Sequence, residues 1–207
     1  MEKFTDENVN MLRDYFNSRA GTWDEHVAEK DAGKLARMAE KLELAPGSVI
    51  LDVGTGTGVF LPYLLQCIGD EGKVVALDIA EEMLEKAREK NPGDNIEFLN
   101  ANIADIPLEG EMFDGIVCYS SFPHFQDKHR ALGEMKRVMK NGGRVFICHT
   151  SSRAHINGIH ANIPLMKDDI LPDIEAMYRL LKDAGFSSIH VEEDGESYFA
   201  RAVKAGE

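Results

Sequence analysis

The 207-residue sequence has little cysteine, no long apolar run and no apolar leader. Its three cysteines, Cys67, Cys118 and Cys148, lie within apolar runs and show none of the paired spacings of zinc sites or disulfide frameworks. We therefore interpret them as reduced core residues. No stretch approaches the roughly 20 apolar residues of a membrane-spanning helix, and the N-terminus is polar and acidic. These absences predict a cytoplasmic protein that does not enter a membrane.

Basic residues are also scarce. The chain carries 23 lysines and arginines against 36 aspartates and glutamates, a formal net charge of −13. This charge repels a phosphate backbone, and no cluster of basic residues with interleaved aromatics offsets it locally. The sequence therefore predicts a small-molecule partner and no nucleic acid. It leaves a monomer and a homodimer equally open.

Short β-rich runs alternate with helical patterns from about residue 48 onward, which is typical of βαβ units. The first five runs are almost continuously apolar, as in parallel strands that helices cover on both faces. Asp194-Gly195 separates the last two, which predicts a type I′ turn and an antiparallel hairpin. The expected fold class is α/β, a Rossmann-like seven-stranded mostly parallel sheet with an antiparallel C-terminal hairpin and helices on both faces. The predicted strands are 48–53, 73–78, 95–100, 113–119, 143–150, 187–193 and 196–203.

Helical patterns with recognisable ends fill the gaps between these strands. Leu35, Met38, Ala39 and Leu42 have helical spacing, and Pro46-Gly47 ends that helix before the first strand. Ahead of it, a helix of about residues 6–19 and a loop to His26 belong to no βαβ unit. The other predicted helices are 59–68, 80–90, 127–140 and 173–184.

A glycine-rich loop follows the first predicted strand. Residues 52–58 are Asp-Val-Gly-Thr-Gly-Thr-Gly, immediately before a helical run. Such glycines let the backbone turn tightly and approach a ligand at the helix N-terminus. The dinucleotide fingerprint needs a further glycine where this sequence has Val59, and Asp52 places a negative charge at the strand end. Both features disfavour a pyrophosphate, and with it a nicotinamide-dependent oxidoreductase.

An acidic residue followed by G-x-G-x-G at this position resembles the first motif of the class I S-adenosylmethionine-dependent methyltransferases. The resemblance spans residues 10–204 and is closest to the small-molecule subgroup typified by the ubiquinone/menaquinone C-methyltransferases. It implies S-adenosylmethionine as cofactor and in-line transfer of its methyl group to a small-molecule acceptor. A negative charge at Asp52 suits a cofactor that carries an ammonium and a sulfonium. The implied binding positions in the loop are Asp52, Gly54, Thr55, Gly56 and Gly58.

Positions after the second and third strands extend this resemblance. It implies that Asp78 accepts hydrogen bonds from the ribose hydroxyls, although the same residue is also placed to cap the following helix. Ile79 and Met83 are expected on the adenine face, where core packing would explain them nearly as well. Asn102, followed by Ile103, stands where the family has an acidic acceptor for the adenine amino group, and its amide oxygen can still accept. Asp105 is a competing candidate that we interpret as a turn residue.

The segment after the fourth strand and the N-terminal segment complete the implied cofactor site. Tyr119 and Ser120 end the strand that meets the methionine moiety in the family. The Asn/Asp-Pro-Pro-aromatic tetrapeptide of enzymes that methylate nucleobase or glutamine amino groups is absent. Residues 13–24 resemble the family's segment that closes over the cofactor, with Tyr15 and Trp23 expected to reach it. A helix that packs Val9, Leu12 and Phe16 on the sheet would also explain this segment, and we expect both roles.

Three histidines are candidates for the acceptor side. The connection 149–172 is too long for a simple turn, and its position at the carboxyl edge of the sheet predicts an insert that shapes the acceptor pocket. We expect His149, His160 and His124 to orient or deprotonate the acceptor. Alternatives are a non-catalytic S-adenosylmethionine-binding protein, or metal-assisted transfer at His149, His155 and His160. The predicted organisation is an N-terminal lid and first helix in 1–45 and a methyltransferase core in 46–207.

Overall fold

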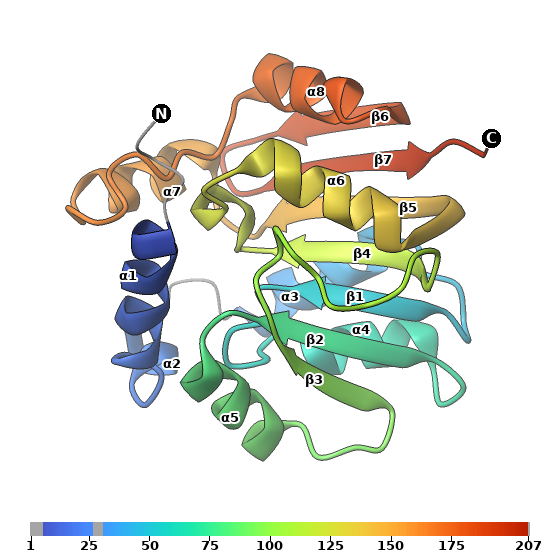
Figure 1. Ribbon diagram of the computed structural model, residues 1–207, viewed down its shortest axis with the longest axis horizontal. Coiled ribbons are helices and arrows are strands. Elements are labelled where there is room, and N and C mark those ends of the chain that lie inside the picture. Colours follow the sequence, from blue (N-terminus) through green and yellow to red (C-terminus); the bar gives the residue numbers. More distant parts are fainter. Residues whose placement is uncertain (1–5, 27–30, 207) are drawn as a thin grey trace.

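The computed structural model describes residues 6–26 and 31–206, and its centre is one seven-stranded sheet. The strand order is β3-β2-β1-β4-β5-β7-β6 (Figure 1). Strands β1 to β5 pair in parallel, whereas β7 runs antiparallel to both β5 and β6. The predicted α/β class, its parallel core and its C-terminal hairpin are confirmed. The strands are β1 Val49–Val53, β2 Lys73–Asp78, β3 Ile96–Asn100, β4 Phe113–Tyr119, β5 Met139–His149, β6 Phe186–Glu193 and β7 Tyr198–Lys204.

Helices flank this sheet on both faces. Side chains at the helix starts satisfy free backbone N–H groups: Asp31, Asp127, Ser152 and Asp173 each accept from the amide three residues on. No described helix has both the length and the apolar character needed to cross a bilayer. The helices are α1 Asp6–Asn17, α2 Trp23–His26, α3 Ala32–Lys41, α4 Leu61–Ile68, α5 Glu81–Lys90, the 3₁₀ helix η1 Phe122–His124, α6 Lys128–Val138, α7 Arg153–Ala161 and α8 Ile174–Asp183.

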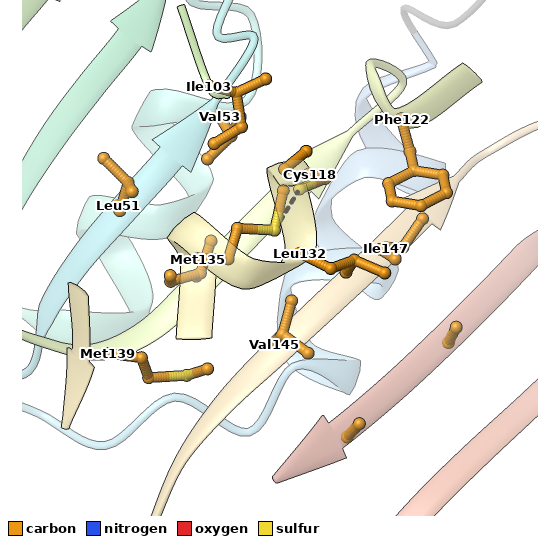
Figure 2. Packing of buried hydrophobic residues seen from close by; sticks show 14 of the residues in the cluster. Leu51, Val53, Ile103, Cys118, Phe122, Leu132, Met135, Met139, Val145 and Ile147 are labelled. Carbon is orange, nitrogen blue, oxygen red and sulfur yellow. Dashed lines mark hydrogen bonds between the residues drawn. The ribbon is translucent and has the colours of Figure 1, made fainter. Parts of the chain in front are cut away.

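Two hydrophobic layers hold the helices on the sheet. Helices α3 and α4 pack their buried leucines and isoleucine on one face, while α6 and α8 cover the other (Figure 1). Figure 2 shows the second layer, in which Leu132 and Met135 of α6 meet Cys118 of β4 and Ile147 of β5. Cys118 and Cys148 are buried and Cys67 half-buried, and all three are free thiols. Their interpretation as core residues is confirmed for the two strand cysteines.

Two local predictions are wrong. The helix predicted over 127–140 ends at Val138, and Met139 already pairs with Phe113 of β4. The expected Gly-Gly turn is instead an irregularity inside β5. The paired residues move on by five positions in β5, from Met139 to Arg144, while those in β4 move on by only two. The hairpin between β6 and β7 has no type I′ turn, since neither Asp194 nor Gly195 has a positive φ. The Asp194 carboxylate accepts from the amides of Glu196 and Ser197 and builds a four-residue loop.

The long connection after β5 is partly helical. Ser152 caps α7, which was not predicted, and Arg153 forms an ion pair with Glu193 of β6 at 2.6 Å. The segment after α7 folds back because Asn157 donates to and accepts from the backbone of Leu171. The predicted loop to His26 likewise contains the one-turn helix α2. Residues 1–5 and 27–30 of the predicted N-terminal unit lie outside the described residues.

The β5 irregularity should be sensitive to side-chain volume. A Cβ atom on Gly143 would lie 2.5 Å from Met139 Cγ and 2.9 Å from the backbone oxygen of Lys140. We expect Gly143→Ala to lower the free energy of unfolding by about 1–3 kcal/mol. The control is Gly133→Ala in α6, where a Cβ meets nothing within 4 Å; it should raise stability by about 0.4–1 kcal/mol. Denaturant unfolding measures both, and equal stability of the two variants would contradict this account.

Candidate functional site

A cavity of about 680 Å³ opens at the carboxyl ends of the parallel strands. Its lining comes from the ends of β1, β2, β4 and β5, from the glycine-rich loop, and from α1, α2 and α7. These three helices stand beyond the strand ends (Figure 1). The volume lies within the roughly 300–1,000 Å³ of small-molecule sites, and the position is where open α/β sheets bind ligands.

The three loop glycines have different roles. All three have positive φ, of 70° at Gly54, 55° at Gly56 and 75° at Gly58. A Cβ on Gly54 would lie 2.4 Å from Ser121 Cβ, and one on Gly58 would lie 2.6 Å from Asn91 Nδ2. Only Gly56 has open space there, on the cavity side. Gly54 and Gly58 thus permit close packing of the protein on itself, whereas Gly56 leaves room for a ligand.

Asp78 at the end of β2 links the cavity to this loop. Its Oδ2 accepts from the Gly56 amide at 2.8 Å, and its Oδ1 accepts from the Ala80 amide at 2.9 Å. Burial raises the pKa of the Asp78 carboxyl, while the amides of Ala80 and Gly56 act in the opposite direction. A carboxylate offers about four lone-pair sites, so two remain for ligand hydroxyls. Asp78 can therefore hold the start of α5 and bind a ligand hydroxyl at the same time.

Asp52 lies behind the loop rather than in the cavity. Asp52 lies in β1 and is 2% exposed. Neither Asp52 nor Gly58 lines the cavity. Burial raises the pKa of Asp52 to about 7, and the Asp78 carboxylate raises it further, while the Thr55 hydroxyl lowers it. The expectation that Asp52 and Gly58 contact a cofactor directly therefore does not match this geometry.

The N-terminal segment closes one side of the cavity. Asp24 of α2 accepts from the Thr57 hydroxyl of the glycine-rich loop at 2.6 Å and pairs with Lys90. Arg13 pairs with Glu81 at the start of α5. Phe16 and Trp23 pack edge to face over Ala80 and Met83. Val9, Leu12 and Phe16, which were expected to pack on the sheet, line the cavity together with Tyr15 and Trp23.

The predicted adenine-side residues meet at the same cavity. Ile79, Met83, Asn102 and Ile103 all line it, together with Thr55, Tyr119 and Ser120. The Asn102 amide oxygen already accepts from the Ala104 backbone amide at 2.9 Å, which leaves one lone pair for a ligand. The competing candidate Asp105 is exposed and lines only a smaller adjoining hollow.

The end of β4 carries a strained residue next to an engaged tyrosine. Ser120 has a φ of 53°, a conformation that costs a non-glycine residue of order 1–3 kcal/mol and clusters at functional sites. The Tyr119 hydroxyl shares a 2.7 Å hydrogen bond with the Thr150 hydroxyl, and its ring stacks on Phe60 with centroids 4.4 Å apart. Tyr119 therefore presents its ring, rather than a free hydroxyl, to the cavity.

The three predicted histidines also line this cavity. His124 of η1 and His160 of α7 have ring centroids 4.7 Å apart, and His149 at the end of β5 lines the same space. His149 is 1% exposed, and its burial, with the charges of His124 and His160, lowers its pKa to about 3. Burial and His124 also lower the pKa of His160. His149 is consequently neutral at physiological pH.

Sequence reasoning missed Asp169 and Arg19. Asp169 lies behind His124 and accepts from its Nδ1 at 2.9 Å, yet the run Lys167-Asp168-Asp169 gives no signal that singles it out. Arg19 lines the cavity and stacks on Tyr15, 3.6 Å from the ring centroid. His155 is exposed, and within 6–26 and 31–206 no three histidine, cysteine or carboxylate side chains form a group that could hold a metal ion. The described residues therefore give no support to the metal alternative.

Known proteins show a consistent similarity. A family model described as a methyltransferase domain matches residues 51–147. A ubiquinone/menaquinone biosynthesis C-methyltransferase of Hahella chejuensis is 32% identical over 178 residues, which cover 81% of this chain and 70% of that protein. Three further relatives of the same name are matched over 60–62% of their length, so this chain spans less than two thirds of those proteins.

Solved structures agree with the sequence relatives. An S-adenosylmethionine-dependent methyltransferase from Aquifex aeolicus is 27% identical with a TM-score of 0.69, over 85% of this chain and 95% of that chain. Phosphoethanolamine N-methyltransferase 2 of Haemonchus contortus, solved in complex with S-adenosyl-L-methionine, shares the fold at a TM-score of 0.69 and 16% identity. It covers 84% of this chain and 52% of that chain.

The buried Asp52 carboxyl should make stability depend on pH. Because its pKa is raised to about 7, the folded protein holds a proton that the unfolded chain releases near pH 4, and this contribution to stability is lost as pH rises to about 7. Asp52→Asn removes that loss. We expect its unfolding free energy, relative to the parent, to rise with pH by up to about 1.4 kcal/mol per unit between pH 4 and 7.

Guanidinium unfolding at pH 5 and pH 8 measures this difference. The exposed Asp94, changed to Asn, is the control, and its difference from the parent should be the same at both pH values. His149 acts with the opposite sign, since its lowered pKa costs stability as pH falls below 6.5, but it is common to all three proteins. A pH-independent difference for Asp52→Asn would contradict the burial argument.

Proposed function

Because the chain belongs to the class I S-adenosylmethionine-dependent methyltransferases, we propose that it methylates a small molecule held against the three imidazoles. The observation that carries this proposal is one continuous cavity that runs from Gly56 to His124 and His160. Bound S-adenosylmethionine supplies a methyl group on a sulfonium, whose transfer leaves a neutral thioether. The protein's own contribution is to hold, align and desolvate the two partners.

The residues at the glycine-rich end fit this cofactor. Gly56 leaves space that a Cβ would fill, and Asp78 keeps lone pairs for two ribose hydroxyls. Ile79 and Met83 supply apolar surface for a purine, and Asn102 supplies an acceptor at its edge. We assign the cofactor to these residues with Thr55, Ile103, Tyr119 and Ser120.

The lid offers a partner for a carboxylate. Arg19 donates to the Tyr15 backbone oxygen and the Ser18 hydroxyl through Nη1, and the residue lines the cavity. Arg130 of α6 also lines the cavity. We propose that Arg19 attracts the carboxylate of the cofactor, with Tyr15 and Trp23 covering it. In this organisation residues 1–45 form the lid and first helix, and 46–207 form the methyltransferase core.

The acceptor side combines imidazoles with apolar surface. His124, His149 and His160 share this end with Ile156, and Ile163 and Met166 complete its lining. The sequence relatives are named as C-methyltransferases of ubiquinone/menaquinone biosynthesis, and this wall suits an acceptor that likewise has an apolar part. The net charge of −13 supports a small molecule over nucleic acid. We assign 149–172 as the acceptor-shaping insert.

The function predicts that a side chain at Gly56 blocks the cofactor. Calorimetric titration should show micromolar S-adenosylmethionine binding to the parent protein and none to Gly56→Val, and NADH should bind neither. Labelled methyl donor with a low-molecular-weight cell extract should yield labelled product only with the parent and the control. Gly47→Val is the matched control, because Gly47 also has a positive φ, of 78°, with nothing within 4 Å of a Cβ, but lies outside the cavity lining. Unchanged binding to folded Gly56→Val would refute the cofactor site.

The lid should respond to the cofactor. The described contacts that attach it to the core include two ion pairs, two hydrogen bonds and one small apolar cluster, so local opening costs less than global unfolding. We expect backbone amides of Tyr15 to Trp23 to exchange more slowly once S-adenosylhomocysteine is bound. The amides of β5, at the sheet centre, serve as the internal reference. Identical exchange of Tyr15 to Trp23 with and without ligand would argue against a lid.

A further inference from the structure

One residue contacts the Nδ1 edge of both imidazoles. The Asp169 carboxylate lies 2.9 Å from His124 Nδ1, and the Asp169 backbone oxygen lies 2.6 Å from His160 Nδ1. Asp169 is only 5% exposed and is not itself part of the cavity lining, whereas both histidines are. It therefore stands behind the two rings, on the side away from an acceptor.

These two contacts fix the tautomers. A carboxylate and a carbonyl oxygen can only accept hydrogen bonds, so each Nδ1 must carry a hydrogen. In the neutral ring the lone pair then sits on Nε2, at the far edge from Asp169. Among the described residues neither Nε2 has a hydrogen-bond partner. The pair thus presents two hydrogen-bond acceptors to the cavity from rings 4.7 Å apart.

The position of Asp169 is held from several sides. Gln126 Nε2 donates to Asp169 Oδ1 at 3.3 Å and to the His124 backbone oxygen at 3.4 Å, which orients the Gln126 amide. Asn157 ties the backbone two residues further on, at Leu171, to α7. The Asp169 amide bonds back to the Met166 oxygen at 2.8 Å. The carboxylate is therefore held in place before any acceptor binds.

Other charged groups around His124 do not replace this contact. Lys128 of α6 has its ammonium bonded to the backbone oxygens of Pro123 and Phe125. Asp78 of β2 interacts with His124 only through charge, and His149 of β5 is neutral. Besides His160, the remaining titratable groups of the lining are Tyr119 of β4, His155 of α7, Asp127 at the N-cap of α6, Arg130 of α6, and Tyr15, Arg19 and Asp24 of the lid. Among the described contacts, only Asp169 pairs a carboxylate with the imidazole nitrogen.

We propose that Asp169 is a positioning residue. It makes His124 the group that takes a proton from the methyl acceptor, and His160 a neutral group that accepts a hydrogen bond. The site therefore selects protic methyl acceptors such as hydroxyls or thiols. This rests on the proposed function. As the acceptor atom bonds to the methyl carbon, His124 Nε2 takes the proton from that atom, while the electron pair of the broken carbon–sulfur bond stays on sulfur. The Asp169 carboxylate stabilises the resulting imidazolium, as an oriented carboxylate does in a catalytic triad. His160 is bonded to a carbonyl, which carries no full charge, and its burial keeps it neutral.

Histidine ¹⁵N NMR tests the assignment on the cofactor-free protein. In the parent, both His124 and His160 should carry hydrogen on Nδ1. In Asp169→Asn the new amide oxygen should face Gln126 Nε2, so its NH₂ faces His124 and moves the His124 hydrogen to Nε2. His160 should keep its tautomer, since its partner is the backbone of residue 169.

Asp183→Asn, an exposed carboxylate of α8 outside the cavity lining, is the matched control and should change neither histidine. An Nε2-protonated His124 in the parent, or an unchanged His124 in Asp169→Asn, overturns the proposal. The unchanged His160 signal and denaturant unfolding show that the variant is folded. If Asp169→Asn does not fold, Gln126→Leu replaces it. There His124 should keep its tautomer, because the Asp169 carboxylate still accepts from Nδ1, and a tautomer change overturns the proposal.

A pair of small probes tests the preference for protic acceptors. Phenol and anisole differ by one O–H donor, and one net hydrogen bond corresponds to about a fivefold difference in affinity. With S-adenosylhomocysteine bound, phenol should bind the parent about fivefold more tightly than anisole, and Asp169→Asn should lose that preference. Equal affinities for the parent overturn the donor requirement. S-adenosylhomocysteine binding itself, measured in the same samples, reports separately on the proposed function.

Discussion

The carboxyl ends of the parallel strands meet at one edge of the sheet, and the rest of the site depends on this constraint. The sheet order places β1 between β2 and β4, so the chain leaves β1 toward one side and β4 toward the other. The connections diverge there and leave a crevice that no covalent segment fills. The glycine-rich loop lies on one side of this crevice and η1 with His124 on the other. A cavity between a cofactor half and an acceptor half is the direct result.

Polar groups buried at this edge hold the crevice in shape. The two Asp78 oxygens accept from Gly56 and Ala80, so one carboxylate fixes both the loop and the start of α5. The Ser121 hydroxyl donates to the Val53 oxygen at 2.6 Å, which joins the ends of β1 and β4. Each bond satisfies a group that would otherwise be costly to bury. The same residues that shape the ligand site are therefore part of the folded core.

The acceptor end is built on a different principle. Its histidines come from η1, β5 and α7, and a single residue of the α7–α8 connection contacts two of them. Burial and mutual proximity lower the pKa of His149 and His160, while His124 has a carboxylate partner. Like groups in one cavity thus have different surroundings, and the proposed division of roles among the imidazoles rests on that difference.

The sequence by itself determined the sheet, its parallel core and the glycine-rich loop, because apolar runs, helix caps and glycines act over a few residues. Most of the site residues that it indicated line the cavity, since strand ends converge in any sheet of this class. It could not show that Asp52 and Gly58 face the interior, since one strand position separates a buried side chain from an accessible one. Nor could it separate Asp169 from Asp168, or find the β5 irregularity. Those depend on packing between segments distant in sequence, and only the tertiary structure brings residue 169 within hydrogen-bond distance of residues 124 and 160.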